Sequence, residues 1–280
     1  MMKALTRSYM KYPGSKQLMM PKLLRHLPKA GGILIDAFTG SSSVALNTDY
    51  QQYLLNDANA DLIALHRLAQ REPDALLKEA RRLFRPETNN AQYYYGVRDS
   101  FNACTNEQDR AILLLYLSRH GYNGLCRYNQ SGGFNTPFGL FKAPYLPEKE
   151  IYHFAEKLEH AEFYSMDFAD FINMVVERFR HSPTRPTKYI DPPYLKHDRQ
   201  TQTFTEYTSA GFKLEQHRSL DAILTENRDQ FNEVLVSNHD GKLLRDTYKG
   251  AKRVVKFRVT RTISAKTKER KPAPEVLLYY

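Results

Sequence analysis

The stretch GGILIDAF at residues 31–38 decides the fold class of this chain of 280 residues. It is a short apolar run that contains an acid near its end, a pattern typical of a buried parallel strand. The turn TGS at 39–41 follows, and residues 42–46 can begin a helix. A glycine turn between a strand and a helix brings the backbone close to a ligand, so the turn at residues 36–40 can cradle a cofactor. Many other α/β folds contain such a turn.

Other segments continue the alternation of strands and helices. Short apolar or β-rich runs predict five further strands, at residues 51–55, 188–190, 233–236, 253–259 and 275–280. The spacing of apolar residues predicts helices at 60–70, 68–84 and 106–119. Strands that alternate with helices imply a mostly parallel sheet with crossover connections, so the expected fold class is α/β.

A long segment of different character separates the second predicted strand from the third. Its last part, residues 120–141 (HGYNGLCRYNQSGGFNTPFGLF), is rich in glycine, asparagine and aromatic residues, and SGG at 131–133 is the expected tip of a hairpin. Loops this long inside compact domains are usually functional. We therefore predict a mainly helical insertion at residues 60–147 with an exposed recognition loop at 120–141. Residues 1–59 and 148–280 would form the other domain.

The composition excludes several classes of protein. A hydrophobic content of 41% and an aromatic content of 12% can build a core, which argues against disorder. No apolar run approaches the roughly 18 residues of a membrane span, and the first residues lack the apolar region of a secretory signal. Two cysteines, Cys104 and Cys126, are too few for a disulfide framework or a four-cysteine zinc site. We expect a soluble, cytoplasmic protein without a membrane partner.

The positive charge is concentrated in one segment. The chain carries 41 Lys and Arg against 31 Asp and Glu, a net charge of +10. Residues 241–271 hold twelve basic and two acidic residues, which accounts for the whole excess. Concentrated positive charge favours a polyanionic partner, because binding releases counterions from phosphates. The alternative is a solvated basic hairpin.

The motif Asp191-Pro192-Pro193-Tyr194 follows the strand predicted at 188–190. It therefore lies at the carboxyl end of a sheet strand, where open α/β sheets bind ligands. Two prolines make the backbone rigid and remove two donors. A carboxylate oxygen and a proline carbonyl can polarise an amine attached to a heteroaromatic ring, and the ring of Tyr194 can stack, without need of its hydroxyl. The alternative is an ordinary turn at the end of a strand.

Two weaker signals concern the cofactor. Asp57 ends the strand predicted at 51–55, at the spacing where an acid binds the ribose hydroxyls of an adenosine group, although it could also be a helix N-cap. The stretch KYPGSK at 11–16 offers an aromatic ring and a lysine, which could stack on adenine and meet a carboxylate. Read alone, it is an ordinary turn.

Taken together, these segments identify a family. GYNGLCRYN and FNTPFG within residues 120–139, YHFA at 152–155, the DPPY motif and SNHD at 237–240 resemble the DNA adenine methyltransferases of the Dam family over nearly the whole chain. The order of cofactor region, target-recognition insertion and catalytic motif is the alpha arrangement of amino-methyltransferases.

The resemblance implies an activity. It is the transfer of a methyl group from S-adenosylmethionine to N6 of adenine in double-stranded DNA, with GATC as the expected target, base flipping, and S-adenosylhomocysteine as product. The implied fold is a Rossmann-like methyltransferase sheet that ends in an antiparallel strand pair. No metal is expected, because transfer from a sulfonium has no water to activate. A monomer suffices, without an obligate protein partner, because one copy can recognise a short site.

The resemblance also implies the site residues. The catalytic residues would be Asp191, Pro192, Pro193 and Tyr194. The cofactor would contact Tyr12, Lys16, Asp36, Phe38, Gly40, Asp57 and Asp191. DNA contacts would come from Lys11, Tyr122, Asn123, Leu125, Arg127, Pro137 and Phe141. The basic segment at 241–271 separately predicts phosphate contacts from Lys266 and Lys268. Two positions depart from the family: Ser42 replaces the second glycine of the cofactor loop, and Tyr12 replaces a tryptophan, which could weaken cofactor binding.

Two other functions compete with this one. The enzyme could methylate another planar amine, in an RNA base or a protein glutamine, but such enzymes more often carry Asn-Pro-Pro-Tyr than the motif with Asp191. The chain could also be an inactive DNA-binding homologue. The presence of Asp57, Asp191 and Tyr194 argues against that alternative.

Overall fold

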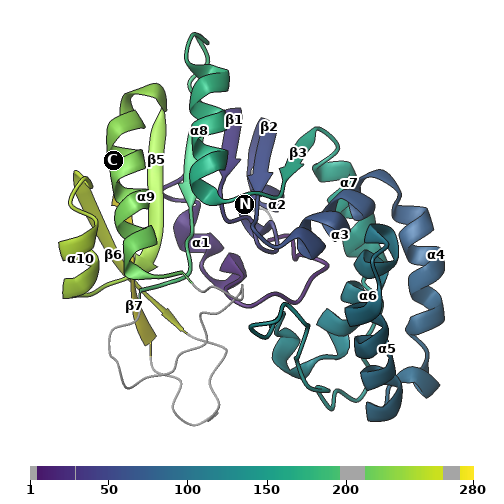
Figure 1. Cartoon of the computed structure of the whole chain (residues 1–280). Helices are drawn as coiled ribbons and strands as arrows, with labels where there is room; N and C mark the ends of the chain where they lie inside the picture. The colour runs from purple at the N-terminus through teal and green to yellow at the C-terminus, as the bar shows by residue number, and fades with distance from the viewer. Residues whose placement is uncertain (1–4, 29, 196–211, 261–271) are drawn as a thin grey trace.

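A mixed β-sheet organises the computed structural model, which describes residues 5–28, 30–195, 212–260 and 272–280 (Figure 1). Within these residues the sheet has seven strands in the order β3-β2-β1-β4-β5-β7-β6. Their bounds are Ala30–Asp36 (β1), Asp49–Asn56 (β2), Ala161–Tyr164 (β3), Thr187–Ile190 (β4), Glu233–His239 (β5), Arg253–Thr260 (β6) and Pro272–Tyr279 (β7).

Five neighbouring strands are parallel. β1 pairs with β2 and β4, β2 pairs with β3, and β4 pairs with β5, all in parallel register. β7 is antiparallel to both β5 and β6, so the sheet ends in the expected antiparallel pair. The α/β prediction is confirmed. The strand order reverses between β1 and β4, and ligands bind at such a switch point in open α/β sheets.

Helices cover both faces of the sheet and enclose two hydrophobic cores. One core lies under α8 (Phe168–Phe179), α9 (Leu214–Asn227) and α10 (Lys242–Thr247). The other lies under α1 (Met20–Leu23), α3 (Ala60–Arg71) and α7 (Glu148–Lys157). Successive residues of β1 enter opposite cores, Leu34 on one face and Ile35 on the other, because strand side chains alternate. The short helix α2 (Ser43–Leu46) follows β1.

Three further helices lie beyond the β3 edge of the sheet, at the lower right of Figure 1. They are α4 (Pro73–Leu83), α5 (Ala91–Ala103) and α6 (Glu107–His120). Helix α6 is buried over most of its length, with nine buried residues, because it packs against α3, α4 and α5. It leads directly into the recognition loop.

Some predicted elements differ from the structure. The single helix expected at 68–84 is wrong: α3 ends at Arg71 and α4 begins at Pro73, because proline cannot donate the backbone hydrogen bond that would continue the first helix. Strand β3 and helices α1, α5, α7, α8, α9 and α10 were not predicted. β3 has only four residues, which are too few for a clear alternation. The buried residues of α5, Tyr94, Val97 and Phe101, do follow helical spacing, and that signal was missed. Among the described residues, we find no helix that could span a membrane.

Candidate active site

Three carboxyl groups lie at the carboxyl ends of adjacent strands. Asp36 ends β1, Asp57 directly follows β2, and Asp191 directly follows β4. Burial raises the pKa of Asp36 well above its ordinary value, and the nearby charges of Asp191 and Asp57 raise it further. The backbone N–H of Phe38 donates to Asp36 Oδ1 at 3.1 Å, which opposes this shift. Acids predicted from separate segments therefore meet at one end of the sheet.

The turn after β1, which we call the cofactor loop (residues 38–42), is held against Asp57. Gly40 adopts φ +48°, and its N–H donates to Asp57 Oδ2 at 3.0 Å. A β-carbon at Gly40 would lie 3.3 Å from Cδ1 of Tyr12, so this ring packs directly on the loop. The structure thus brings together Tyr12, Gly40 and Asp57.

Asp57 is not the N-cap of the helix that follows it. That position belongs to Asn59, whose Oδ1 accepts from the N–H of Leu62 at 3.2 Å. Asp57 instead accepts from the N–H groups of Gly40 and Asn59, each at 3.0 Å. Burial raises the pKa of Asp57 to about 6 in spite of these two bonds. The helix-cap alternative is therefore wrong for α3. The two backbone bonds instead fix the Asp57 carboxylate in one orientation, as a ligand-binding group requires.

The family's missing glycine has a structural counterpart. Ser42 adopts φ +55° and ψ +26°, the left-handed conformation that glycine prefers. Its hydroxyl lies 3.1 Å from that of Thr39, and Ser41 and Ser43 form a second hydroxyl pair at 2.8 Å. The loop therefore keeps a left-handed backbone at this position without the glycine.

Asn56, which the sequence analysis did not select, ties the strand ends together. Its side-chain amide donates to the carbonyls of Ala37 and Met166, both at 3.1 Å, and its Oδ1 accepts from the N–H of Met166. The side chain is fully buried. The signal that could have found it is its position directly before Asp57, at the end of a predicted strand.

The DPPY motif forms a buried polar network with the N-terminal turn. Lys16 Nζ lies 2.7 Å from Asp191 Oδ2 and donates to the Tyr194 hydroxyl at 2.8 Å. That hydroxyl donates to Glu275 Oε2 at 2.9 Å and lies 3.1 Å from Ser237 Oγ. The hydroxyl therefore has partners, which the sequence analysis did not anticipate.

Charge in this network is set by burial and pairing. Burial raises the pKa of Asp191 to about 6, and the nearby ammonium of Lys16 opposes the shift. Burial also disfavours the charge on Lys16, but Asp191, Tyr189 and Glu275 outweigh it and raise the pKa of Lys16. The second carboxylate oxygen, Asp191 Oδ1, is buried and has no hydrogen-bond partner among the described residues. A buried acceptor of this kind fits a ligand N–H.

Aromatic rings line the neighbourhood of the cofactor loop. The ring of Phe38 stacks with Phe168 at 5.8 Å between centroids and meets Phe212 edge-on at 5.6 Å. Phe168 begins α8, directly after the loop that Asn56 holds. These contacts give the predicted cofactor residue Phe38 a fixed apolar environment.

The recognition loop is an ordered hairpin, as predicted. Isolated bridges join Gly121 to Phe138 and Tyr128 to Phe134, and the tip closes through a bond from the N–H of Asn129 to Gly133 O at 2.8 Å. The predicted tip at residues 131–133 is confirmed.

The predicted DNA contacts lie on this hairpin with different exposures. Tyr122 is 46% exposed, whereas Leu125 is only 9% exposed and packs inside the loop. Arg127 donates from Nε to Asn135 Oδ1 at 2.5 Å and from Nη2 to Asn135 O at 3.1 Å.

The other predicted contacts surround the base of the hairpin. Asn123 adopts φ +53°, and the exposed Pro137 accepts from the N–H of Tyr122 at 2.8 Å. Lys11 Nζ lies 3.7 Å above the centre of the Phe141 ring, so the N-terminal segment and the loop meet here. Lys266 and Lys268 lie outside the described residues.

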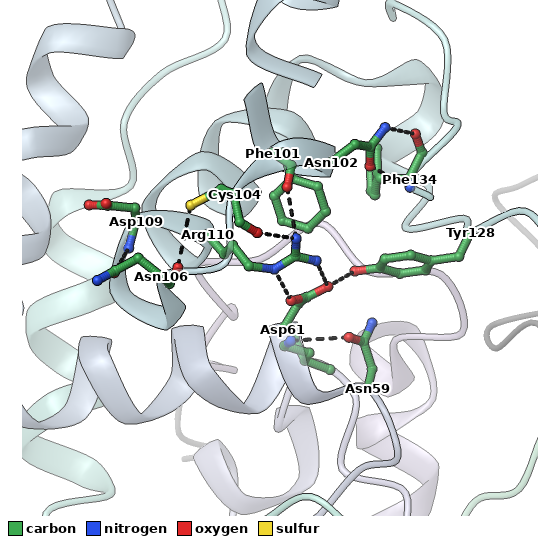
Figure 2. Close-up of polar contacts among 11 residues, drawn as sticks. Asn59, Asp61, Phe101, Asn102, Cys104, Asn106, Asp109, Arg110, Tyr128 and Phe134 are labelled. Carbon is green, nitrogen blue, oxygen red and sulfur yellow. Dashed lines mark hydrogen bonds and ion pairs between the residues drawn. The ribbon is translucent and has the colours of Figure 1, made fainter. Parts of the chain in front are cut away.

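A bidentate ion pair between two helices forms the anchor point of the hairpin (Figure 2). Arg110 on α6 donates from Nε and Nη2 to the two carboxylate oxygens of Asp61 on α3, both at 2.8 Å. The hydroxyl of Tyr128 donates to the same carboxylate at 2.8 Å. Asn102 on α5 exchanges two bonds with the backbone of Phe134. Tyr128, the neighbour of Arg127, is thereby fixed to α3, the helix that follows Asp57.

This sheet, with acids at the ends of β1 and β2 and the DPPY motif after β4, defines a Rossmann-like methyltransferase. The chain belongs to the D12 class N6 adenine-specific DNA methyltransferase family, whose model matches residues 12–263. It is therefore an adenine-specific DNA methyltransferase, and its substrate is DNA. Among the described residues, no group of three or more His, Cys, Asp or Glu side chains is arranged to hold a metal ion.

Curated relatives agree with the family model. The proteins named DNA adenine methylase from Salmonella typhi and from Escherichia coli strain K12 are each 43% identical over 275 residues, which cover 98% of this chain and 95% of theirs. The one from Serratia marcescens is 41% identical and covers 98% of both chains. A solved rRNA methyltransferase from Streptomyces viridochromogenes aligns with a TM-score of 0.37 and 11% identity, over 94% of this chain and 82% of that one, which is too distant to carry an argument.

Proposed function

We propose that the chain methylates adenine N6 within GATC sites of double-stranded DNA, after flipping the adenine out of the helix. The observation that carries the chemistry is the buried Oδ1 of Asp191, which has no hydrogen-bond partner within the described part of the chain, beside the rigid Pro192–Pro193 backbone. An amine N–H that donates to this oxygen leaves its lone pair less delocalised into the ring. The curated relatives, named DNA adenine methylases, support the substrate class.

S-adenosylmethionine is the proposed cofactor, and it supplies a methyl group on a sulfonium that an amine can attack directly. Asp57 would accept bonds from its ribose hydroxyls, Tyr12 would stack on the adenosine, and Lys16 would meet the carboxylate. Asp36, Phe38 and Gly40 would form the walls of the site. The acceptors at the ends of β1, β2 and β4 fit a ligand rich in N–H and O–H donors. No metal is needed for this transfer.

The proposed catalytic residues hold the flipped base. Asp191 and the carbonyl of Pro192 would accept from the N6 amine, Pro193 would keep this backbone rigid, and Tyr194 would stack on the adenine ring. The Tyr194 hydroxyl accepts a bond from Lys16 and donates one to Glu275, which supports a fixed position for that ring.

Sequence recognition is assigned to the insertion at residues 60–147 and its recognition loop. Arg127 is the proposed reader of guanine, because a guanidinium can grip O6 and N7 with two bonds. The other proposed DNA contacts are Lys11, Tyr122, Asn123, Leu125, Pro137 and Phe141, with phosphate contacts from Lys266 and Lys268. The enzyme is proposed to act as a monomer in the cytoplasm.

Methyl transfer from tritiated S-adenosylmethionine tests this function, with mass spectrometry of the digested product. A duplex with one GATC should acquire N6-methyladenine, and the same duplex with that site altered at one base pair should react far more slowly. EDTA should change neither rate. Labelling of RNA or of a glutamine-containing protein in preference to the GATC duplex, or equal labelling of both duplexes, would contradict the proposal.

A further inference from the structure

A buried relay of two side chains lies behind the cofactor loop, outside the residues assigned so far. The hydroxyl of Tyr9 lies 2.7 Å from His66 Nδ1, and His66 Nε2 lies 2.7 Å from the carbonyl oxygen of Gly40. Tyr9 and His66 are both 0% exposed. The relay connects the N-terminal segment, helix α3 and the cofactor loop, which are far apart in the sequence.

The relay permits only one arrangement of protons. A carbonyl oxygen can only accept, so His66 Nε2 must carry the hydrogen that it shares with Gly40. Burial lowers the pKa of His66 to about 4, so the ring is neutral at pH 7 and Nδ1 must accept from Tyr9. The imidazole packs against Phe154 and Phe163, with ring centroids at 5.1 Å and 5.4 Å. Its tautomer and its orientation are both fixed.

Gly40 is consequently held on both of its peptide groups. His66 donates to its carbonyl, and its N–H donates to Asp57 Oδ2 at 3.0 Å. Tyr12 packs against its α-carbon. A glycine at φ +48° has wide conformational freedom unless its neighbours restrict it. The relay supplies the restriction on the side away from Asp57.

We propose that His66 is a positioning residue for the cofactor: it fixes the Gly40 carbonyl so that the Gly40 N–H and Asp57 keep the geometry that binds the ribose. Tyr9 sets the tautomer that lets His66 donate. His66 does not touch the reacting atoms. Its loss should therefore weaken cofactor binding and leave DNA binding unchanged.

Two substitutions of similar size separate this role from simple packing. His66→Gln can place its amide nitrogen near the position of Nε2 and still donate to Gly40. The shorter His66→Asn can reach only the position of Nδ1, beside Tyr9. We expect the dissociation constant for S-adenosylmethionine, measured by calorimetry, to rise about tenfold in His66→Asn and about twofold in His66→Gln. The dissociation constant for a GATC duplex should stay within about twofold in both.

The thermal midpoint of each variant is measured beside its affinity, and ¹⁵N NMR of the wild-type imidazole reports the tautomer. A hydrogen on Nε2 supports the proposal, and a hydrogen on Nδ1 overturns it. Equal losses of cofactor affinity in the two variants at equal thermal midpoints would also overturn it. Because the positioning role presumes the proposed cofactor site, the test measures binding and not methylation. A wild-type protein that binds the cofactor but methylates no GATC duplex would contradict the proposed function and leave the relay test intact.

Discussion

The carboxyl end of the sheet and the recognition loop are built in opposite ways. At the sheet end, polar groups are buried and bonded to one another, as in the contacts of Asp191 with Lys16 and of Asp57 with Gly40. In the loop, Tyr128 near the tip is bonded to Asp61 on α3, while Tyr122 and Leu140 near the base are 46% and 83% exposed.

The proposed function assigns a different physical task to each of these two regions. Chemistry on one amine needs dipoles that are oriented before the substrate arrives, since reorganising them during the reaction would raise the barrier. Recognition of a duplex needs side chains that project from a surface into a groove. A substitution at the sheet end should therefore change rate or cofactor affinity for every DNA sequence alike. A substitution in the loop should change the preference among sequences.

The largest effect is expected at Asp191. Asp191→Ala should lower the single-turnover rate by about 10²–10³ or more on every duplex, because the amine loses its charged acceptor. The measurement is quenched-flow methyl transfer at saturating cofactor, with circular dichroism to verify folding. Asp229→Ala, at an acid that is 92% exposed, is the control and should retain the wild-type rate. Retention of half the wild-type rate in Asp191→Ala would remove this residue from the catalytic site.

The pKa of Asp57 predicts a pH dependence of stability at the sheet end. Because the folded pKa is raised to about 6 from 3.8, the folded protein keeps a proton that the unfolded chain has released. The free energy of unfolding of the cofactor-free protein should then fall as pH rises from about 4 to about 6. Asp57→Asn removes this contribution. The thermal midpoint of the variant should therefore rise relative to that of the wild type between about pH 4 and pH 6, and the difference between the two midpoints should stay constant above pH 7. Parallel curves throughout would show that the buried carboxylate carries no such cost.

A smaller effect should appear where the loop is joined to the frame. Tyr128→Phe removes the bond to the Asp61 carboxylate, worth about 1.5–3 kcal/mol, and should reduce the ratio of methylation rates between GATC and near-cognate duplexes without changing cofactor affinity. Tyr152→Phe is a matched control, because its hydroxyl donates to Asp74 at 2.6 Å outside the loop. The same reduction in both variants would mean that the bond to Asp61 has no special role in recognition.

The smallest effect concerns the serine that replaces a glycine in the cofactor loop. Ser42→Gly relieves a left-handed backbone, but glycine loses more chain entropy on folding and the bond to Thr39 is lost. The net gain in unfolding free energy should be under about 1 kcal/mol. Ser41→Gly, at a residue without positive φ, should destabilise the protein. Thermal unfolding of the two variants decides the sign, and a loss in Ser42→Gly would show that its hydroxyl bond outweighs the strain.

The sequence predicted those features of the structure that depend on residues close together in the chain. The run at 31–38 and the DPPY motif predicted strands β1 and β4 with their acids, because the burial of a strand and its end depend on residues that are adjacent in the sequence. The bond between Tyr194 and Glu275 joins residues 81 positions apart, and neither residue carries a signal of the other. His66 looks like one more residue on the buried face of α3, and only the packing of Tyr9 and Gly40 around it reveals the relay.

The division between chemistry and recognition is tested most directly by comparing Asp57→Ala with Arg127→Ala. Both are assayed by single-turnover methylation of a GATC duplex and a panel of duplexes altered at one base pair, at one salt concentration and at a subsaturating concentration of cofactor. Asp57→Ala should lower all rates by a common factor and preserve their order. Arg127→Ala should lose about 1–3 kcal/mol of discrimination at the guanine positions. An equal fall of the methylation rate on every duplex in Arg127→Ala would contradict this division. So would a change in the order of the duplexes by methylation rate in Asp57→Ala.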